Sequence, residues 1–564
     1  MAGPDEDRGG SRDEFIEEHV VTLNPVVGMG LEDIVKAVAR VAQQVTVQPM
    51  VAAEHALQFS AELARVLFGG SELAPSPRDA RFKDTMFHDN AVYSRLARSW
   101  LAWQGTVNDW VEAAGFEGED LDRARFVAAL ITDALAPTNF LVGNPAALRK
   151  AFQTRGSSLV AGAKNLIHDI RFNNGMPSQV DKSAFKVGDN LAVTPGSVIH
   201  RDDIVELIQY QPQTDDVNVT PIMIVPPQIN KYYIYDLSPQ KSMARFLLEA
   251  GFQVFMVSWR NPGPEHRDWG LDDYVTSLDA AIDVTRQVCE VDAIHVVGAC
   301  AGGITLASAL GYLAGKGDFE KVASLTLMVN VLQPSAEDSV IGLFAGDEAI
   351  EAARKRSARD GVLDGGDTAR VFNWMRPNDL IWNYVVSNYL QGESPPAFDI
   401  LYWNNDTTRL PARLHSDFLD TFKDNSLTKQ GALQIREVPV DLAKVTCPAF
   451  VTGGTTDHIT PWQACYRTTQ ILGGEVTFVL STAGHIQSLI NPPGSSKRKF
   501  LINASTPASA EEWLKDAEEH AGSWWPYWAQ WLTEQSPDNK VAPTDYGNQK
   551  FSELVQAPGT YVFE

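Results

Sequence analysis

Residues 294–304 of the chain read "IHVVGACAGGI", a β-branched apolar run that enters a turn of small residues. A helical pattern, "GGITLASALGYLAG", begins at once at Gly302. This order of strand, sharp turn and helix is typical of the nucleophile elbow, where an esterase of the α/β-hydrolase fold carries serine in G-x-S-x-G. The central residue here is Cys300, so the motif predicts a thiol nucleophile. A helix amino terminus favours the thiolate, because its free N–H groups and dipole stabilise negative charge.

Apolar runs that are typical of buried strands flank this motif and alternate with helical patterns. The strand-like runs occupy residues 221–229, 252–261, 293–300, 324–332, 448–454 and 476–485. Between two of them, residues 271–289 form the helical pattern "LDDYVTSLDAAIDVTRQVC". Buried strands interleaved with helices predict a mainly parallel sheet that is covered on both faces. Together with the elbow, this pattern predicts an α/β protein with the α/β-hydrolase fold.

The composition and the spacing of apolar residues change along the chain and predict three regions. Residues 1–30 are largely acidic and polar, which predicts a disordered tail rather than a signal or transit peptide. Residues 31–185 show apolar residues at helical spacing and predict a helical amino-terminal domain. Strand-like segments follow, so residues 186–564 predict the catalytic domain. Within it, an aromatic and proline-rich insertion at about 335–440 lies where this fold carries its cap.

Composition narrows the classes of partner. The 564-residue chain has a formal net charge of −24, which argues against nucleic acid or an anionic membrane as partner, because both favour a basic surface. No apolar run approaches the roughly 20 residues of a spanning helix, so we expect no transmembrane segment. No cysteine stands in a C-x-x-C pair or at metal-ligand spacing to a histidine, so we expect no metal. The chain also lacks G-x-x-x-x-G-K-[ST] and a convincing G-x-G-x-x-G, and we expect no cofactor. Cys289, Cys447 and Cys465 are expected to be buried packing residues.

A nucleophilic thiol requires a base, and the base requires an orienting carboxylate. In the α/β-hydrolase order, the acid and then the histidine follow the nucleophile along the chain. Asp457 in "GGTTDHITPW" and His485 in "STAGHIQSLINPP" each stand just beyond a predicted strand. Ligands bind at the carboxyl edge of such sheets, where these loops gather. The pattern predicts Cys300, Asp457 and His485 as the catalytic residues, with His458 as the alternative base.

The predicted oxyanion hole consists of two backbone N–H groups. One belongs to Ala301, which directly follows the nucleophile. The second is expected near the end of the strand within residues 221–229. Pro226 has no N–H group, so Val225 is the expected second donor.

Several long motifs resemble those of the polyhydroxyalkanoate synthases, and the resemblance covers most of residues 79–564. The motifs include "VPPQINKYYIYDLSP" (225–239), "GACAGG" (298–303), "PPAFDILYWNNDTTRLP" (395–411) and "GHIQSLINPP" (484–493). The cap and "GHIQS" are most similar to the medium-chain members of that family.

This resemblance implies a specific reaction and site. It implies that Cys300 carries the acyl group, that His485 is the general base, and that Asp457 either assists His485 or activates the incoming hydroxyl. The substrates would be (R)-3-hydroxyacyl-CoA and the growing polyester chain, with CoA carried in by the substrate and released, and with no metal. The family also implies a homodimer at the surface of cytoplasmic polyester granules, where residues 31–185 would contact the granule or granule-associated proteins.

A thiol suits this reaction for a chemical reason. It exchanges one thioester for another at little free-energy change, so the bound acyl group stays activated until a hydroxyl accepts it. Water would compete for the acyl-enzyme, and a large apolar cap is expected to exclude it. The alternative is a cysteine-type α/β-hydrolase, either an acyl-CoA thioesterase or a dienelactone-hydrolase-like enzyme, which would release only free acid. A third reading is a granule-coat protein without catalysis.

A tryptophan-rich segment near the carboxyl terminus, "HAGSWWPYWAQWL" (520–532), lies outside these motifs. Trp524, Trp528 and Trp531 stand close to helical spacing, which favours packing in the core. The alternative is an apolar face that touches polymer or a partner protein.

Overall fold

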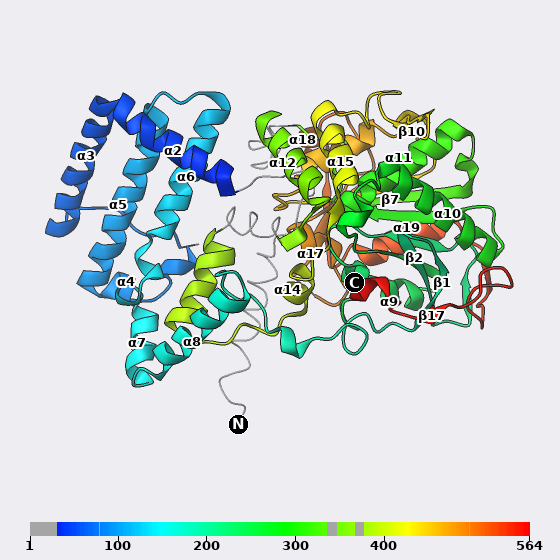
Figure 1. The fold of residues 1–564 in the computed structure, drawn as a ribbon, viewed down its shortest axis with the longest axis horizontal. Helices are drawn as coiled ribbons and strands as arrows, with labels where there is room; N and C mark the ends of the chain where they lie inside the picture. The colour runs from blue at the N-terminus through cyan, green and yellow to red at the C-terminus, as the bar shows by residue number, and fades with distance from the viewer. Residues whose placement is uncertain (1–30, 78, 336–346, 367–376, 496) are drawn as a thin grey trace. The chain divides into compact units, whose positions relative to one another are not determined.

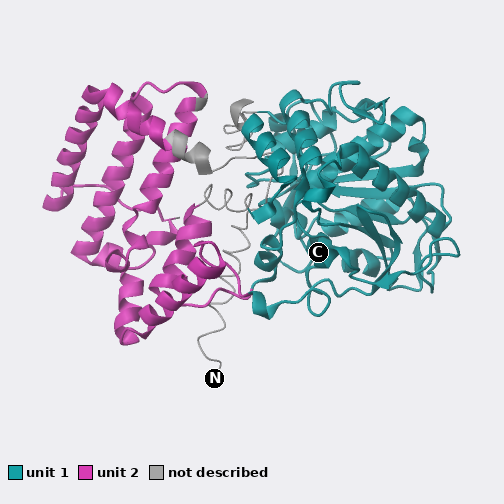
Figure 2. Cartoon of the chain, viewed as in Figure 1, with its two compact units in different colours: residues 1–28, 182–369, 398–564 teal, residues 29–181, 370–397 magenta. Residues whose placement is uncertain are grey.

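The chain divides into two compact units, which Figure 2 shows in different colours. The computed structural model describes residues 31–77, 79–335, 347–366, 377–495 and 497–564. The helical unit comprises residues 29–181 and 370–397, and the sheet unit comprises residues 1–28, 182–369 and 398–564. The predicted tail at residues 1–30 lies outside the described residues.

The helical unit is built from helices that pack through their apolar faces. Its α-helices are α2 (Leu31–Val47), α3 (Pro49–Phe68), α4 (Met86–Asp89), α5 (Ala91–Ala113), α6 (Gly118–Ala134), α7 (Pro145–Gln153) and α8 (Ser157–Phe172) (Figure 1). Asn90 begins α5, because its side chain accepts hydrogen bonds from the N–H groups of Val92 and Tyr93. Trp110 of α5 lies in one core cluster with Ala124 of α6. The predicted helical amino-terminal region is confirmed.

Residues 370–397 belong to the helical unit, although the sequence places them within the expected cap insertion. They contain two π-helical turns, η10 (Asn378–Trp382) and η11 (Val385–Leu390). Tyr389 Oη donates a hydrogen bond to Asp169 Oδ2 of α8 at 2.9 Å, across 220 residues of sequence. A local sequence pattern does not reveal such a long-range contact. This explains why the sequence places these residues in the cap, whereas the structure places them in the helical unit.

The sheet unit contains an eleven-stranded sheet in the order β15-β14-β13-β12-β7-β6-β4-β5-β2-β1-β17 (Figure 1). Its strands are β1 (Gly196–Arg201), β2 (Val205–Tyr210), β4 (Ile222–Val225), β5 (Val254–Trp259), β6 (Ile294–Ala299), β7 (Val322–Met328), β12 (Ala449–Gly454), β13 (Val476–Ser481), β14 (Lys499–Ile502), β15 (Glu518–Ala521) and β17 (Val555–Gln556). The helices used below are α11 (Cys300–Lys316), α17 (His485–Leu489) and α19 (Trp525–Gln535). The six strands from β13 to β5 in this order run parallel, so the predicted mainly parallel sheet is confirmed.

Helices cover both faces of the sheet. A Cβ at Gly298 of β6 would meet Leu306 of α11, and Gly298 lies beside Leu327 of β7 in the ladder. Because side chains alternate along a strand, Thr326 of β7 points to the other face. There its hydroxyl accepts a hydrogen bond from Trp528 Nε1 of α19 at 3.0 Å. α11 and α19 therefore lie on opposite faces, as the sequence predicts.

The tryptophan-rich segment belongs to the core of the sheet unit. Trp524 and Trp528 are fully buried, and Trp531 is only 9% exposed. Core packing is confirmed, and the alternative of an apolar face open to polymer or partner is wrong for these side chains.

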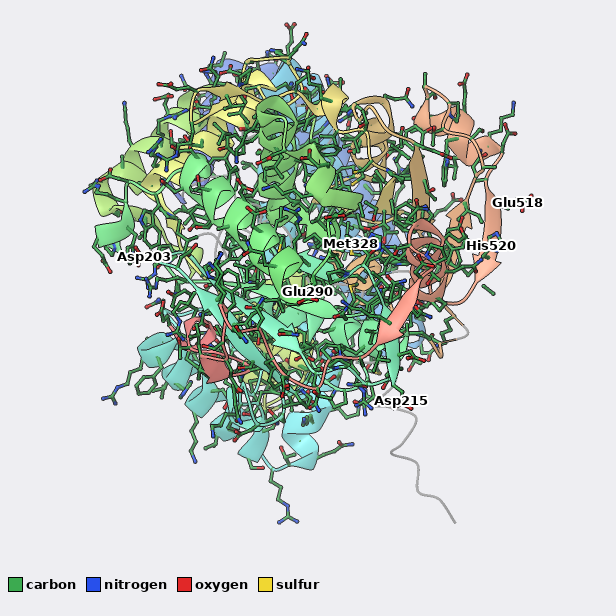
Figure 3. The ribbon with its side chains drawn as sticks, turned by 90° about the vertical axis from the view of Figure 1, so that its right-hand side faces the viewer. Asp203, Asp215, Glu290, Met328, Glu518 and His520 are labelled. Atoms are coloured by element: carbon green, nitrogen blue, oxygen red, sulfur yellow. The ribbon has the colours of Figure 1, made fainter. Side chains whose placement is uncertain are left out.

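The strands β6 and β7 lie in the middle of the sheet. Figure 3 shows Glu518 and His520 on the edge strand β15, away from Met328 at the carboxyl end of the central strand β7. Charged side chains on an edge strand discourage pairing with another chain. The ends of β6 and β7 are enclosed on both sides by further strands.

The described part of the expected cap insertion contains three helices in the sheet unit. They are α12 (Asp347–Asp360), α14 (Asp399–Asn404) and α15 (Ala412–Asp424). Ile350 of α12 and Leu419 of α15 share a core cluster, so these two helices pack on each other. Residues 336–346 and 367–376, also within the expected cap, lie outside the described residues.

Candidate active site

Cys300 occupies the joint between β6 and α11, where the backbone turns sharply. Its φ is +47°, a left-handed conformation that is strained for a residue with a side chain. A Cβ at Gly302 would lie 2.3 Å from the carbonyl oxygen of Pro226, so this position requires glycine. A Cβ at Gly298 would lie 2.9 Å from Cα of Gly303. The two glycines of G-x-C-x-G therefore allow the helix to begin directly against the sheet.

Asn330 holds the elbow from the neighbouring strand. It follows β7 by two residues and is fully buried, and its Nδ2 donates to the carbonyl oxygen of Cys300 at 2.7 Å. A Cβ at Gly303 would lie 2.7 Å from the same nitrogen, which explains the second glycine of the GG pair. Sequence reasoning missed Asn330, although a single amide inside the apolar run 324–332 was a usable signal.

Asp457 and His485 form a hydrogen-bonded pair of buried side chains. His485 Nδ1 lies 2.7 Å from Asp457 Oδ2. The other carboxylate oxygen, Oδ1, accepts hydrogen bonds from the N–H groups of Ile459 and Thr460, each at 2.9 Å. Thr460 Oγ1 also donates to Asp457 Oδ2 at 2.6 Å. These contacts hold the carboxylate in one orientation toward the imidazole.

His485 lies between the carboxylate and the thiol. Asp457 binds Nδ1, so Nε2 is the ring nitrogen that remains to serve the thiol. Burial by itself lowers the pKa of His485, but the Asp457 charge and the hydrogen bonds to Asp457 and Cys300 outweigh it and raise the pKa to about 10. Burial raises the pKa of Asp457, whereas His485 and Thr460 lower it, and the net shift is downward. His485 is therefore a strong base, because the Asp457 carboxylate stabilises its protonated form.

Buried indoles position the helix that carries His485. Trp524 Nε1 donates to the carbonyl oxygen of Ser488 at 2.9 Å, and Trp525 Nε1 donates to that of Leu489 at 3.1 Å. Both carbonyls lie in the last turn of α17, where the C=O groups have no N–H partner within the helix. The tryptophan segment thus supports the base, a role that the sequence pattern did not reveal.

The positions of the predicted oxyanion donors follow from the fold. Ala301 is the second residue of α11, so its N–H belongs to the first turn, whose N–H groups point out of the helix end. Val225 is the last residue of β4 and lies beside Gly298 in the ladder. The two residues after it are prolines, which have no N–H. Both assignments stay predictions.

The structure brings together the three side chains that the chain order predicts. Cys300 follows the end of β6, Asp457 lies in the loop after β12, and His485 is the first residue of α17, beyond the loop after β13. His458, the alternative base, is half-buried next to Asp457. The fold and this arrangement define the class, which is an α/β-hydrolase-fold protein with cysteine at the elbow beside a histidine–aspartate pair.

Comparisons with known proteins give the family. Residues 78–247 match the family described as "Poly-beta-hydroxybutyrate polymerase (PhaC) N-terminus", and residues 221–492 match the family "alpha/beta hydrolase fold". The chain is 46% identical over 547 residues to "Poly(3-hydroxyalkanoate) polymerase 1" of Ectopseudomonas oleovorans, with 97% of each chain covered. It is 39% identical over 512 residues to "Poly(3-hydroxyalkanoate) polymerase subunit PhaC" of Cupriavidus necator, with 89% of this chain and 86% of that one covered. The chain therefore belongs to the poly(3-hydroxyalkanoate) polymerase family, and the resemblance seen in its motifs is confirmed.

The substitution Asp457→Asn tests the charge pair through the pH dependence of stability. The folded pKa of His485 lies above its usual value, so the pair contributes fully below pH 6.5 and its contribution is lost as the pH rises through about 10. The variant leaves a buried imidazole without its counter-charge. We expect thermal unfolding to show a loss of roughly 3–5 kcal/mol at about pH 6, which shrinks toward pH 10. A loss that stays constant with pH would contradict the charge pair.

Proposed function

We propose that Cys300 carries the acyl group while this polymerase joins (R)-3-hydroxyacyl units, taken from CoA thioesters, into polyester. The observation that carries the proposal is a thiol at a strained elbow, beside a histidine that a buried aspartate holds at 2.7 Å. This arrangement combines a nucleophile, a base and an orienting charge in one site.

In the first step Cys300 exchanges one thioester for another. His485 Nε2 takes the thiol proton, and the sulfur attacks the carbonyl carbon of the acyl-CoA. The N–H groups of Ala301 and Val225 are the proposed donors to the oxyanion that forms. The bond from that carbon to the CoA sulfur then breaks, and CoA leaves with the proton from His485. The acyl group is now a thioester of Cys300.

In the second step a hydroxyl group accepts the acyl group. His485 takes the hydroxyl proton, the oxygen attacks the carbonyl carbon, and an ester bond forms. The bond to Cys300 Sγ breaks, and the sulfur or its imidazolium partner keeps the proton. An oxoester is lower in free energy than a thioester, so chain growth is downhill. A serine at this position would lose that activation in the first step.

We assign Asp457 the role of orienting His485. Its Oδ2 lies 2.7 Å from Nδ1, and the side chains of both residues are at most 1% exposed. The carboxylate thereby stabilises the imidazolium that forms when the base takes a proton. His485 rather than His458 is the proposed base, because its Nδ1 lies 2.7 Å from Asp457 Oδ2 and its pKa is raised by both Asp457 and Cys300.

Transfer to a hydroxyl is favoured over hydrolysis by the burial of the reacting groups. Cys300 is 7% exposed and His485 is 3% exposed, which limits the access of water to an acyl-enzyme. A thioesterase or a dienelactone-hydrolase-like enzyme would need water at this same carbonyl. A coat protein without catalysis would not require a strained cysteine beside a buried charge pair, because both features cost stability.

The wider setting follows from the resemblance to the family. We propose a homodimer that needs no metal or cofactor and works at the surface of cytoplasmic polyester granules, with medium-chain units as the preferred substrate. Val160, Ile167 and Phe172 of the helical unit are exposed apolar side chains, which supports contact of this unit with polymer or granule-associated proteins. Within the described ranges, no helix has the length and apolar character that crossing a membrane requires.

The substitution Cys300→Ala is expected to abolish polymer formation and to lower CoA release by at least roughly 10³-fold, because the nucleophile is lost. Mass spectrometry of wild-type enzyme quenched during turnover should place the acyl adduct on the peptide that contains Cys300. Cys447→Ala is the matched control, since Cys447 is equally buried and burial raises its pKa to about 12. An adduct on another residue, or free hydroxy acid as the only product, would rule out the proposed mechanism.

Chelation tests the proposed independence from metals. The thiol, imidazole and carboxylate provide every group that the two steps require, so CoA release by enzyme dialysed against EDTA should equal that of untreated enzyme. Loss of activity that a divalent cation restores would show that a metal takes part.

A further inference from the structure

Tyr235 ends a short 3-10 helix, η5 (Tyr232–Tyr235), in the segment that follows β4. This segment packs on the first turns of α11, because Gln228 Nε2 donates to Thr305 Oγ1 at 2.8 Å. The segment that carries Tyr235 therefore lies against the helix that begins at Cys300.

The hydroxyl of Tyr235 is buried and has no hydrogen-bond partner within the part of the chain that the structure describes. Its ring is fully buried as well. The same segment also touches the elbow, because a Cβ at Gly302 would lie 2.3 Å from the carbonyl oxygen of Pro226. Burial raises the pKa of Tyr235, and its interaction with Cys300 raises the pKa further. The nearby Tyr233 differs, because its hydroxyl donates to Asp406 Oδ2 at 2.8 Å. An unpaired buried hydroxyl lowers stability, which raises the question of what it binds in the working enzyme.

A 3-hydroxyacyl group on Cys300 presents two oxygens close to the sulfur. The carbonyl oxygen is assigned above to backbone N–H groups. The other oxygen is on C3, and it is a hydroxyl in a single unit and an ester oxygen in a growing chain. It can accept a hydrogen bond in either form. The raised pKa keeps the Tyr235 hydroxyl protonated, so this group is available as a donor.

We propose that Tyr235 is a positioning residue whose hydroxyl donates a hydrogen bond to the C3 oxygen of the acyl unit on Cys300. The proposal rests on the proposed function, because it requires the acyl group to be on that sulfur. The bond orients the acyl unit and makes the site selective for acyl groups with oxygen on C3. An acyl group without this oxygen leaves the buried hydroxyl unpaired, and such a mismatch is a strong source of discrimination.

The test compares two CoA esters with wild-type enzyme and with Tyr235→Phe, which keeps the ring and removes only the hydroxyl. Rapid-quench measurements give the rate at which (R)-3-hydroxyoctanoyl-CoA and octanoyl-CoA acylate the enzyme. We expect the preference for the 3-hydroxy ester to fall by roughly tenfold in the variant, almost entirely through slower reaction of that ester.

Tyr233→Phe is the matched control, because it removes a hydroxyl that already has a partner. It should lower Tm by leaving Asp406 unpaired and should keep the preference between the two esters. Tyr235→Phe should leave Tm unchanged or raise it. Equal slowing with both esters, or an unchanged preference, would overturn the proposal. Failure of the acylation mechanism itself is distinguishable, because the Cys300→Ala enzyme would then still form an acyl adduct.

Discussion

The left-handed backbone at Cys300 is the constraint on which the rest of the site depends. A side chain can stand at the end of β6 with α11 beginning at once only if the chain turns within one residue, and φ of +47° is how it turns. The turn places the thiol at the helix amino terminus, but it brings the helix so close that a Cβ at Gly302 would lie 2.3 Å from a carbonyl oxygen. Asn330 then closes the arrangement by binding the Cys300 carbonyl at 2.7 Å. Strain of this kind persists only where the surrounding structure over-determines it, and the fully buried amide of Asn330, just beyond the end of β7, does so here.

The electrostatics of the site follow from the same enclosure. A buried imidazole by itself would be neutral, and a buried carboxylate by itself would be protonated. Asp457 and His485 reverse both effects of burial, because each stabilises the charged form of the other. The two atoms that face each other, Asp457 Oδ2 and His485 Nδ1, lie 2.7 Å apart. Thr460 adds two hydrogen bonds to the carboxylate, which holds it in its ionised form. The imidazole is thereby kept strongly basic next to a thiol, in surroundings from which water is largely excluded. This combination suits an acyl-enzyme thioester that must resist hydrolysis until a hydroxyl group accepts the acyl group.

Much of this site could be predicted from the chain because its parts have local signatures. A strand ending in G-x-C-x-G identifies the elbow, and residues just past later strands identify Asp457 and His485, since parallel strands gather their carboxyl ends at one edge. The supporting residues have no such signature. Trp524, Trp528 and Trp531 are predicted to pack in the core, which is correct. The sequence does not reveal that the indole N–H groups of Trp524 and Trp525 also bind the carbonyls of α17. Residues 370–397 read as part of the cap, and hydrogen bonds to α8 place them in the helical unit instead.

The amino-acid sequence by itself determined the order of strands and helices, the thiol at the elbow and the identity of its partners, because each depends on short-range pattern and on the connectivity of a parallel sheet. The tertiary structure alone decided which nitrogen of His485 faces the carboxylate, which amide holds the elbow, and whether a given buried hydroxyl finds a partner among the described residues. These are relations between side chains far apart in sequence, set by packing in three dimensions, and no periodicity along the chain records them. Tyr233 and Tyr235 illustrate the limit, since two tyrosines in one short motif look alike in sequence. Only the fold gives the first a carboxylate partner and leaves the second without a partner among the described residues.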